Sequence, residues 1–269
     1  MATTESRAFD RLLDYIEESL GFATSMYNNA YLDRRISARM RRNDADSYRA
    51  YQRRLESDDE EQQALLDALS VNVTSFFRNA DVWEALRPVL RELTAAGRTK
   101  VWSAACSDGR EAYSLAMLAH DDPEVRADRI RIVGTDIKRS ILQAAKRGEY
   151  LASETNDLES QLAPIGDYER YVERDEDCYR VSRPVKRMVE FRRHDLIRES
   201  PPHEFDLVLC RNLFIYVDAD AKRAVFETLG SGLRPGGYLT IGMTETVPSA
   251  CRSWFEPVEK RLRIYRSTR

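Results

Sequence analysis

The strongest constraint on the fold is an alternation of short apolar runs with helical patterns, which begins at about residue 98. VWSAAC at 101–106, IRIVGTD at 130–136 and DLVLC at 206–210 have the character of strands. Each is followed by a segment in which apolar residues recur at helical spacing. This alternation is typical of a parallel sheet with helices on both faces, so the sequence predicts an α/β domain.

The C-terminal part of the chain predicts an edge to that sheet. Pro235-Gly236-Gly237 predicts a turn into a strand at 238–242. Segments 253–258 and 261–266 predict two more strands, joined tightly through Glu259-Lys260. We expect these two strands to form an antiparallel hairpin on the sheet edge.

Residues from about 148 to 190 interrupt the alternation. The run at 169–181 predicts strands around an acidic turn, and we interpret the whole stretch as a small inserted β-subdomain. One of its faces is expected to be covered by Tyr168, Tyr171, Val172, Tyr179 and Val181.

The first 70 or so residues predict helices instead. Apolar residues recur at helical spacing between Phe9 and Leu20, and again between Leu32 and Met40. Gly21 is suited to end the first helix, Ser47 to cap a third, and the acidic run at 58–61 to begin a fourth. We therefore expect an all-helical N-terminal domain with its junction at 1–79 and the α/β domain at 80–269.

Composition excludes several classes. The apolar runs are far shorter than the ~20 residues of a membrane helix, and MATTESRAFD lacks the order of a secretory signal. The four cysteines form no CxxC pair and the three histidines are scattered, so no metal site is predicted. A net charge of −3 argues against general nucleic-acid binding. The simplest interpretation is a reduced, cytoplasmic protein.

Ligands of such sheets bind beyond the carboxyl ends of the strands. In VWSAACSDGREAYS (101–114), a strand leads through Ser107-Asp108-Gly109 into a helix, with Glu111 near the mouth. Gly109 allows close backbone approach, and the helix N-terminus favours a negative group. With a single glycine, the segment is a weak dinucleotide signature, and an ordinary strand–turn–helix link explains it equally.

Asp136 ends the next strand, where an acid can accept both hydroxyls of a ribose. It is also suited to cap the following helix, and both interpretations can hold. Without a glycine-rich pyrophosphate loop, this acid favours S-adenosylmethionine over a nicotinamide dinucleotide. Asp195 and Leu196, at the end of VEFRRH (189–194), suit an adenine amino group and ring face, or are simply a strand end.

Three further candidates are a residue pair, a short segment and a single tyrosine. Arg211-Asn212 follows a buried strand, with helix capping by Asn212 as the alternative. In NVTSFFRN (72–79), polar residues alternate with Phe76 and Phe77, and taken alone this segment favours an interdomain hinge with a phenylalanine anchor. Tyr216 taken alone favours core packing.

Together these segments resemble the CheR-type chemotaxis receptor methyltransferases, which are protein-glutamate O-methyltransferases. The resemblance spans nearly the whole chain and preserves motif order, and its most specific parts are NVTSFFR, VWSAACSDGREAYS, VGTDI, FDLVLCRNLFIY and LRPGGYLTIGMTE. It implies an S-adenosylmethionine-dependent methyltransferase (Rossmann-like) domain carrying the inserted β-subdomain and preceded by the helical domain. It also implies methylation of glutamate side chains on the cytoplasmic helices of chemoreceptors for sensory adaptation, with S-adenosylhomocysteine as product.

The resemblance assigns roles to particular residues. It implies that Arg78 and Tyr216 act on the substrate carboxylate, that Glu111 holds the methionine amino group and that Asp136 holds the ribose. The other positions it implies for the cofactor site, which also includes Arg78, are Asn72, Thr74, Asp195, Leu196, Arg211 and Asn212. Independently of the resemblance, nothing in the sequence demands more than a monomer, and we expect neither nucleic-acid binding nor insertion into the membrane.

The chain departs from the family pattern in four places. Arg110 stands where a second acid is usual, Ala112 where a proline is usual, and Met243 where a histidine is usual. The inserted subdomain is short around Arg174–Cys178, which predicts docking without a tether to a receptor's C-terminal peptide.

A basic helical face is a candidate receptor-docking surface. It is formed by Arg35, Arg39 and Arg42, with Arg34 beside them, and an ordinary solvated face is the alternative.

A non-catalytic adaptor that senses the cofactor is the second functional hypothesis. A nucleic-acid methyltransferase is disfavoured by the net negative charge and by the lack of an Asp/Asn-Pro-Pro-aromatic motif after DLVLC. A nicotinamide dehydrogenase is disfavoured because the turn after the first strand has a single glycine.

Overall fold

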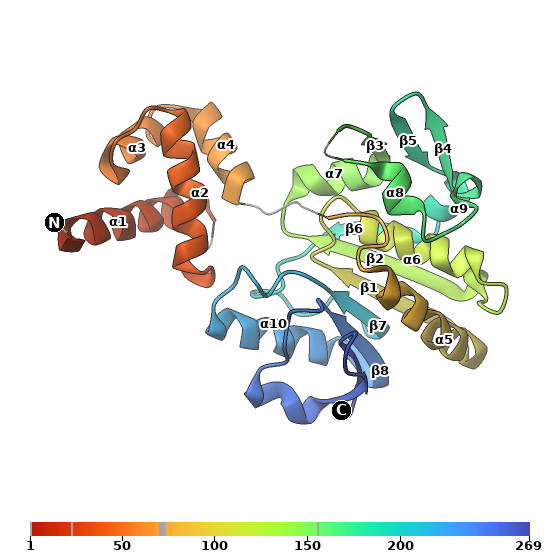
Figure 1. The fold of residues 1–269 in the computed structure, drawn as a ribbon. Coiled ribbons are helices and arrows are strands. Elements are labelled where there is room, and N and C mark those ends of the chain that lie inside the picture. Colours follow the sequence, from red (N-terminus) through yellow and green to blue (C-terminus); the bar gives the residue numbers. More distant parts are fainter. Residues whose placement is uncertain (1, 23, 70–73, 155) are drawn as a thin grey trace. The chain divides into compact units, whose positions relative to one another are not determined.

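The computed structural model describes residues 2–22, 24–69, 74–154 and 156–269. The chain forms two compact units (Figure 1). The helical unit comprises Met1–Val71 and Phe214–Lys222, and the sheet unit comprises Asn72–Leu213 and Arg223–Arg269.

Four helices build the helical unit, as the sequence predicted. Helix α1 packs on α3, and α2 packs on α4. Gly21 follows α1 with φ +71°, and the side chain of Ser47 accepts a hydrogen bond from the backbone N–H of Ala50 to cap α3. The helices are α1 (Ala2–Leu20), α2 (Asn29–Arg42), α3 (Tyr48–Leu55) and α4 (Asp59–Leu69), with a short 3-10 helix η1 at Thr24–Met26.

A distant segment completes this unit. Val217 forms an isolated antiparallel bridge with Tyr27. The Tyr216 carbonyl accepts a hydrogen bond from the Asn28 N–H at 3.0 Å. The ring centroids of Tyr216 and Tyr31 lie 5.1 Å apart. The division predicted from the sequence assigns these residues to the α/β domain, whereas in the structure they group with the helices.

The sheet unit contains a seven-stranded sheet of order β6-β2-β1-β7-β8-β10-β9. The first five strands in this order are parallel, and β10 pairs antiparallel with both β8 and β9. The predicted parallel sheet with an antiparallel edge hairpin is therefore confirmed. The strands are β1 (Thr99–Ala104), β2 (Ile130–Asp136), β6 (Val189–Arg193), β7 (Phe205–Cys210), β8 (Leu233–Ile241), β9 (Phe255–Glu259) and β10 (Ile264–Ser267).

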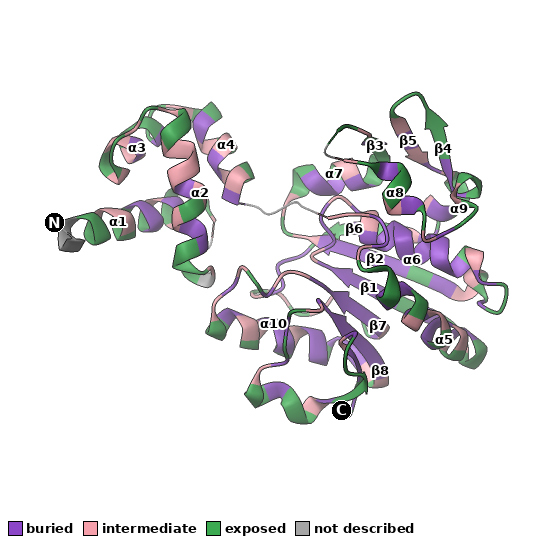
Figure 2. Cartoon of the chain, viewed as in Figure 1, coloured by how far each residue is buried: buried purple, intermediate pink, exposed green. Residues whose placement is uncertain are grey.

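The central strands β1, β2 and β7 are buried almost continuously along their length (Figure 2), as expected for parallel strands that are covered on both faces. Val101 joins a core cluster with residues of α5, α6 and α7, whereas the next residue, Trp102, stacks on Phe205 with ring centroids 5.1 Å apart. Helices α6 and α7 contact β2 and β6, and α5 packs on α6. The helices are α5 (Ala80–Ala96), α6 (Arg110–Asp121), α7 (Arg139–Arg147) and α10 (Ala219–Ser231), with 3-10 helices η2 (Ala127–Arg129) and η4 (Ser249–Trp254).

The inserted β-subdomain is a three-stranded antiparallel sheet of order β3-β5-β4. Glu176 and Asp177 form the predicted acidic turn between β4 and β5. Of the five predicted face residues, Tyr171, Val172, Tyr179 and Val181 are buried in the same cluster as α6, and Tyr168 is partly buried against it. The elements are β3 (Glu149–Leu151), α8 (Leu158–Leu162), η3 (Tyr168–Arg170), β4 (Val172–Asp175), β5 (Cys178–Val181) and α9 (Arg183–Lys186).

Several predicted boundaries move. Pro235-Gly236-Gly237 lies inside β8 rather than before it, where the pairing register with β7 shifts. The hairpin strand β9 begins at Phe255 because the preceding residues form η4, and the connection to β10 runs over 260–263. Strand β6 ends at Arg193. No helix among the described residues is long and apolar enough to cross a membrane.

Candidate functional site

The connectivity of the sheet marks one place for a ligand. From β1 the chain proceeds to β2 and β6 on one side, and then returns to β7 and β8 on the other. The strand order therefore reverses between β1 and β7, and ligands of such sheets bind in the crevice outside the carboxyl ends of the strands at this point. The residues at those ends are the turn from Ala105 to Gly109 and the pair Arg211-Asn212.

Backbone strain is concentrated at the same place. Among the described non-glycine residues with positive φ, five lie in the loops at this edge, at Phe77, Asn79, Ala105, Ser107 and Asn212, with φ from 44° to 63°. Such conformations cost on the order of 1–3 kcal/mol each and persist where the surroundings impose them. They indicate loops whose shape is held for a purpose other than stability.

A buried ion pair joins the ends of β1 and β7. The Glu111 carboxylate, in the first turn of α6, accepts a hydrogen bond from Ser103 Oγ at 2.8 Å, and its other oxygen lies 3.6 Å from Arg211 Nη1. Burial raises the pKa of Glu111 although the Arg211 charge opposes this, and burial lowers the pKa of Arg211. Both charges are thus held at a cost, which is characteristic of functional sites.

Arg211 also fixes the loop that contains Arg78. Its Nη2 donates to the Arg78 carbonyl at 2.7 Å and to Asn79 Oδ1 at 3.0 Å. Trp83 Nε1 donates to the same carbonyl at 3.1 Å, and the Arg211 guanidinium lies 5.5 Å from the Trp83 ring centroid. The backbone from which the Arg78 side chain projects is therefore held by two donors.

Phenylalanines anchor the same loop. Phe76 and Phe77 are buried in the core cluster, and the Phe77 N–H donates to Ser114 Oγ at 3.0 Å. Thr74 is half-buried, and its carbonyl accepts a hydrogen bond from Arg110. Asn72, which the sequence also placed in the site, lies outside the described residues.

Asp136 at the end of β2 holds the turn after β1. Its Oδ2 accepts from the Ser107 N–H and its Oδ1 from the Lys138 N–H, both at 3.0 Å. Burial raises the pKa of Asp136, and these backbone hydrogen bonds oppose the rise. Ser107 Oγ is buried without a hydrogen-bond partner among the described residues. An orphaned hydroxyl beside a buried acid fits a ligand at this position.

Asp195 and Leu196 follow β6, and both are buried. Asp195 Oδ1 accepts hydrogen bonds from the N–H groups of Ile197 and Arg198 at 2.9 and 3.2 Å. The backbone of its own turn therefore satisfies Oδ1, and Oδ2 is the oxygen to consider for a ligand.

The structure adds Glu245, to which the sequence analysis gave no role. It is buried after β8, and its Oε2 accepts from the Asn212 N–H at 3.0 Å and the Gly242 N–H at 2.6 Å. A Cβ at position 242 would stand 2.5 Å from that oxygen, so glycine is required there. The Glu245 carboxylate thus imposes the strained conformation of Asn212.

Packing also constrains Gly109. A Cβ at this position would meet Phe191 at 2.8 Å and the Ala145 Cβ at 2.9 Å, and the residue has φ +88°. Packing and backbone conformation therefore favour glycine here independently of any ligand, and close approach of a ligand to this backbone stays a prediction.

The predicted docking face also needs correction at one residue. Arg39 forms an ion pair with Glu61 of α4, which also accepts a hydrogen bond from the Tyr51 hydroxyl. Burial acts to raise the pKa of Glu61, but these bonds outweigh it and lower the pKa. Arg39 is thus committed within the helical unit. Arg34 and Arg42 are exposed, and Arg35 is half-buried, with its guanidinium 5.6 Å from the Tyr31 ring centroid.

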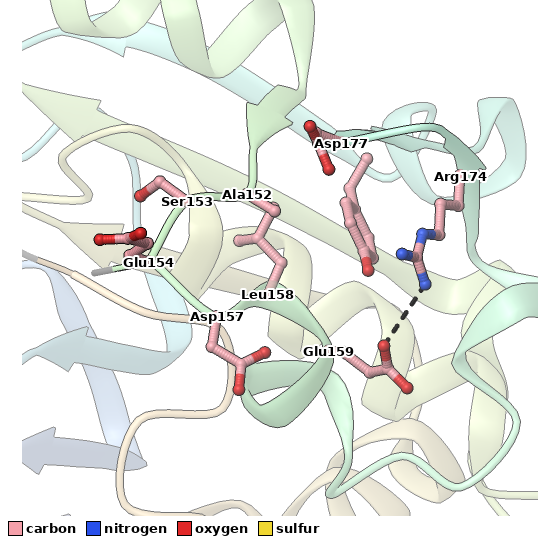
Figure 3. A pocket seen from close by; sticks show the side chains of 9 residues that line it. Ala152, Ser153, Glu154, Asp157, Leu158, Glu159, Arg174 and Asp177 are labelled. Carbon is pink, nitrogen blue, oxygen red and sulfur yellow. Dashed lines mark hydrogen bonds and ion pairs between the residues drawn. The ribbon is translucent and has the colours of Figure 1, made fainter.

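A cavity of about 360 Å³ lies elsewhere, in the inserted subdomain (Figure 3). Four of its lining residues are acidic, and one of them, Glu159, lies 3.3 Å from Arg174. It includes none of the residues at the strand ends. Among the described residues, no group of three His, Cys, Asp or Glu is placed to hold a metal ion.

The sheet order with its antiparallel β10 between β8 and β9, together with acids at the ends of β1, β2 and β6, defines the class of S-adenosylmethionine (SAM)-dependent methyltransferases. Residues 72–264 match the family model "CheR methyltransferase, SAM binding domain", and residues 7–70 match "CheR methyltransferase, all-alpha domain". The chain therefore belongs to the CheR methyltransferase family, and SAM is its cofactor.

Named relatives agree with this assignment. The chemotaxis protein methyltransferase of Listeria monocytogenes is 32% identical over 235 residues, which cover 86% of this chain and 87% of the relative. Chemotaxis protein methyltransferase 1 of Pseudomonas aeruginosa is 34% identical over 194 residues, covering 69% and 70%. A solved structure, of the glycopeptide N-methyltransferase MtfA, is 14% identical with a TM-score of 0.37, covering 60% of this chain and 55% of that one.

Proposed function

We propose that this protein transfers the methyl group of SAM to glutamate side-chain carboxylates on the cytoplasmic helices of chemoreceptors, giving glutamyl methyl esters for sensory adaptation. The relatives named above are chemotaxis protein methyltransferases. The observation that carries the proposal is the buried Glu111–Arg211 pair, which is bonded to the loop of Arg78. It connects a cofactor-binding acid with a candidate substrate-binding arginine.

The strand ends offer a partner for each part of the cofactor. Glu111 would hold the methionine ammonium group, whose charge compensates the buried carboxylate. Asp136 would hold the ribose hydroxyls beside Ser107, and Asp195 Oδ2 with Leu196 would contact the adenine. Thr74, Arg211 and Asn212 are further members of the proposed cofactor set.

The proposed chemistry requires no general base. The bound cofactor supplies a methyl group on a sulfonium cation, which makes that carbon electrophilic. A glutamate carboxylate has a reference pKa of ~4.3 and is ionised at neutral pH. When an anion attacks a cation, charge disappears in the transition state, so exclusion of water and correct positioning supply the acceleration.

Arg78 would position the substrate carboxylate, and the role of Tyr216 stays a prediction. Arg78 projects from backbone that Arg211 and Trp83 hold in place, so its guanidinium starts from a fixed point. Burial raises the pKa of Glu111, and the charge of Arg78 is among the effects that oppose this rise, which supports a position for Arg78 near the Glu111 carboxylate. A guanidinium orients a carboxylate through paired hydrogen bonds.

Removal of Arg78 tests this role. We expect Arg78→Ala to reduce methyl transfer about 100-fold, the cost of losing alignment of reacting groups. The dissociation constant for S-adenosylhomocysteine should change by less than about threefold, because Glu111 and Asp136 remain. Methyl transfer is measured as radiolabel that is incorporated into receptor and released by base, and the dissociation constant is measured by calorimetry. Equal loss in both measurements would contradict a substrate role for Arg78.

The same assays separate the adaptor hypothesis from the enzyme. A non-catalytic adaptor would bind S-adenosylhomocysteine and release no base-labile methyl from any receptor offered. Esterified receptor together with cofactor binding supports the methyltransferase.

The basic face of α2 is the proposed docking surface for acidic receptor helices, formed by Arg34, Arg35 and Arg42 without Arg39. We expect the double reversal Arg34→Glu/Arg42→Glu to slow receptor methylation at low salt by about 10-fold, because electrostatic steering contributes 10-fold or more to association. The loss should shrink as salt is added. Initial rates of receptor methylation against ionic strength measure it.

Arg49→Glu/Arg53→Glu on α3 is a matched control, because both residues are exposed and the total charge changes equally. If the α2 reversal behaves like this control, the α2 face is an ordinary solvated surface.

A further inference from the structure

Arg110 occupies a position that is unfavourable for an arginine. It is the first residue of α6, where the positive end of the helix dipole disfavours a cation. Its side chain is nevertheless only 12% exposed. A buried charge at an unfavourable position must be compensated by specific contacts. The contacts of the Arg110 guanidinium therefore indicate its role.

Three segments of the sheet unit supply those contacts. Arg110 Nη1 donates to the Thr74 carbonyl at 3.2 Å, to Asn156 Oδ1 at 3.0 Å and to Gln161 Oε1 at 3.2 Å. Its Nε lies 3.2 Å from Asp108 Oδ2 as an ion pair. The partners belong to the loop before α5, to the turn after β1 and to the inserted subdomain.

The partners are also bonded to one another. Gln161 Oε1 accepts from the Phe76 N–H at 3.1 Å, and Gln161 Nε2 donates to Asn156 Oδ1 at 3.0 Å. The Tyr150 hydroxyl donates to the Asp108 carbonyl at 2.7 Å, and the Arg110 guanidinium lies 5.1 Å from the Tyr150 ring centroid. The three segments thus form a closed network with one guanidinium at its centre.

We propose that Arg110 is a positioning residue that locks the inserted β-subdomain to the Thr74–Arg78 loop and to the turn after β1, Ala105 to Gly109. Through this lock, the subdomain holds the loop in the shape that the cofactor and the substrate carboxylate require. Only the consequence for the cofactor rests on the proposed function, because the mechanical coupling is a property of the network itself. A guanidinium suits this task since its rigid planar fork can direct Nη1 at the three acceptors while it lies over the Tyr150 ring, whereas lysine presents a single mobile ammonium.

The test combines amide hydrogen exchange with ligand titration of the full chain. In Arg110→Gln, we expect the Phe76 amide, whose acceptor is Gln161 Oε1, to exchange at least about 10-fold faster, because its acceptor is no longer fixed. The dissociation constant for S-adenosylhomocysteine should rise about 10-fold. When receptor methylation is assayed, the KM for SAM should rise by a larger factor than kcat falls. Arg110→Lys should recover only part of each effect, since it restores charge without the fork.

Two further variants define the comparison. Arg87→Gln is the matched control, because Arg87 is 16% exposed and paired with Glu84 and Asp121 of α5 and α6. It tests the loss of a half-buried arginine outside the network. Asn156→Ala removes a different member of the network, and its effects should be less than additive with those of Arg110→Gln.

The outcomes separate this proposal from the proposed function. If Arg110→Gln matches Arg87→Gln in exchange at Phe76 and in ligand affinity, the coupling is refuted. If Arg110→Gln does not fold, Asn156→Ala decides, and unchanged Phe76 exchange there refutes the coupling. If the wild-type protein fails to bind S-adenosylhomocysteine, the proposed function fails, while the exchange measurement still tests the lock.

Discussion

Replacing Glu111 by glutamine is expected to weaken binding of S-adenosylhomocysteine by about 10- to 100-fold. The variant keeps the shape of the side chain but loses the negative charge that is proposed to face the ligand ammonium, and hydrogen bonds to charged groups contribute about 1.5–3 kcal/mol. The free energy of unfolding of the ligand-free protein should fall by less than about 3 kcal/mol, because Arg211 loses its countercharge but keeps its hydrogen bonds to the Arg78 carbonyl and to Asn79. Calorimetry and urea unfolding measure the two quantities.

The same residue predicts a pH dependence. Since burial raises the pKa of Glu111, its protonated form favours the fold of the ligand-free protein, and that contribution is lost as pH rises through the raised pKa. Ligand affinity should follow the opposite course and fall as pH is lowered, because the protonated acid no longer attracts an ammonium group. Glu111→Gln should abolish this part of both pH profiles.

Glu124→Gln is the control for Glu111, because Glu124 is 67% exposed and lies past the C-terminal end of α6, whereas Glu111 lies in its first turn. It should bind ligand like the wild type at every pH. Wild-type affinity in Glu111→Gln would remove Glu111 from the cofactor site.

Arg211→Met is expected to lower the free energy of unfolding by about 3–5 kcal/mol, the usual cost of breaking a buried ion pair from one side. The substitution leaves Glu111 buried without its countercharge, and it removes the donor to the Arg78 carbonyl and to Asn79. Urea denaturation measures the loss. The double variant with Glu111→Gln should be more stable than the sum of the single losses implies, because the uncompensated charge is gone.

Arg234→Met provides the surface comparison. Arg234 is 43% exposed and bonds Asp206 at 3.0 Å, and exposed pairs contribute about 0–1 kcal/mol. A loss in Arg211→Met no larger than that of Arg234→Met would show that the Glu111–Arg211 pair is not desolvated as described.

Local signals in the sequence were sufficient for the elements they govern. The alternation after residue 98 predicted the parallel sheet, and Ser47 predicted the start of α3. Helix α5 was not predicted, although Val82, Trp83 and Leu86 are spaced for a buried stripe, because Pro88 lies inside it and weakens the helical pattern.

Contacts between distant segments could not be predicted in this way. Nothing in the spacing of Arg39 or Glu61 indicates that they meet across two helices, and helical periodicity therefore placed Arg39 on a docking face. Glu245 likewise shows no sign in the sequence that it binds the N–H of Asn212, 33 residues earlier. Such pairings depend on the fold, whereas capping and periodicity depend on neighbours along the chain.

The return of residues 214–222 to the N-terminal helices has a consequence for dissecting this protein. A fragment ending at residue 71 would lack the aromatic ring that covers Tyr31 and the extended stretch that bridges Tyr27. Such a fragment would expose apolar surface that is buried in the full chain. Truncation at one position therefore does not yield the complete helical unit.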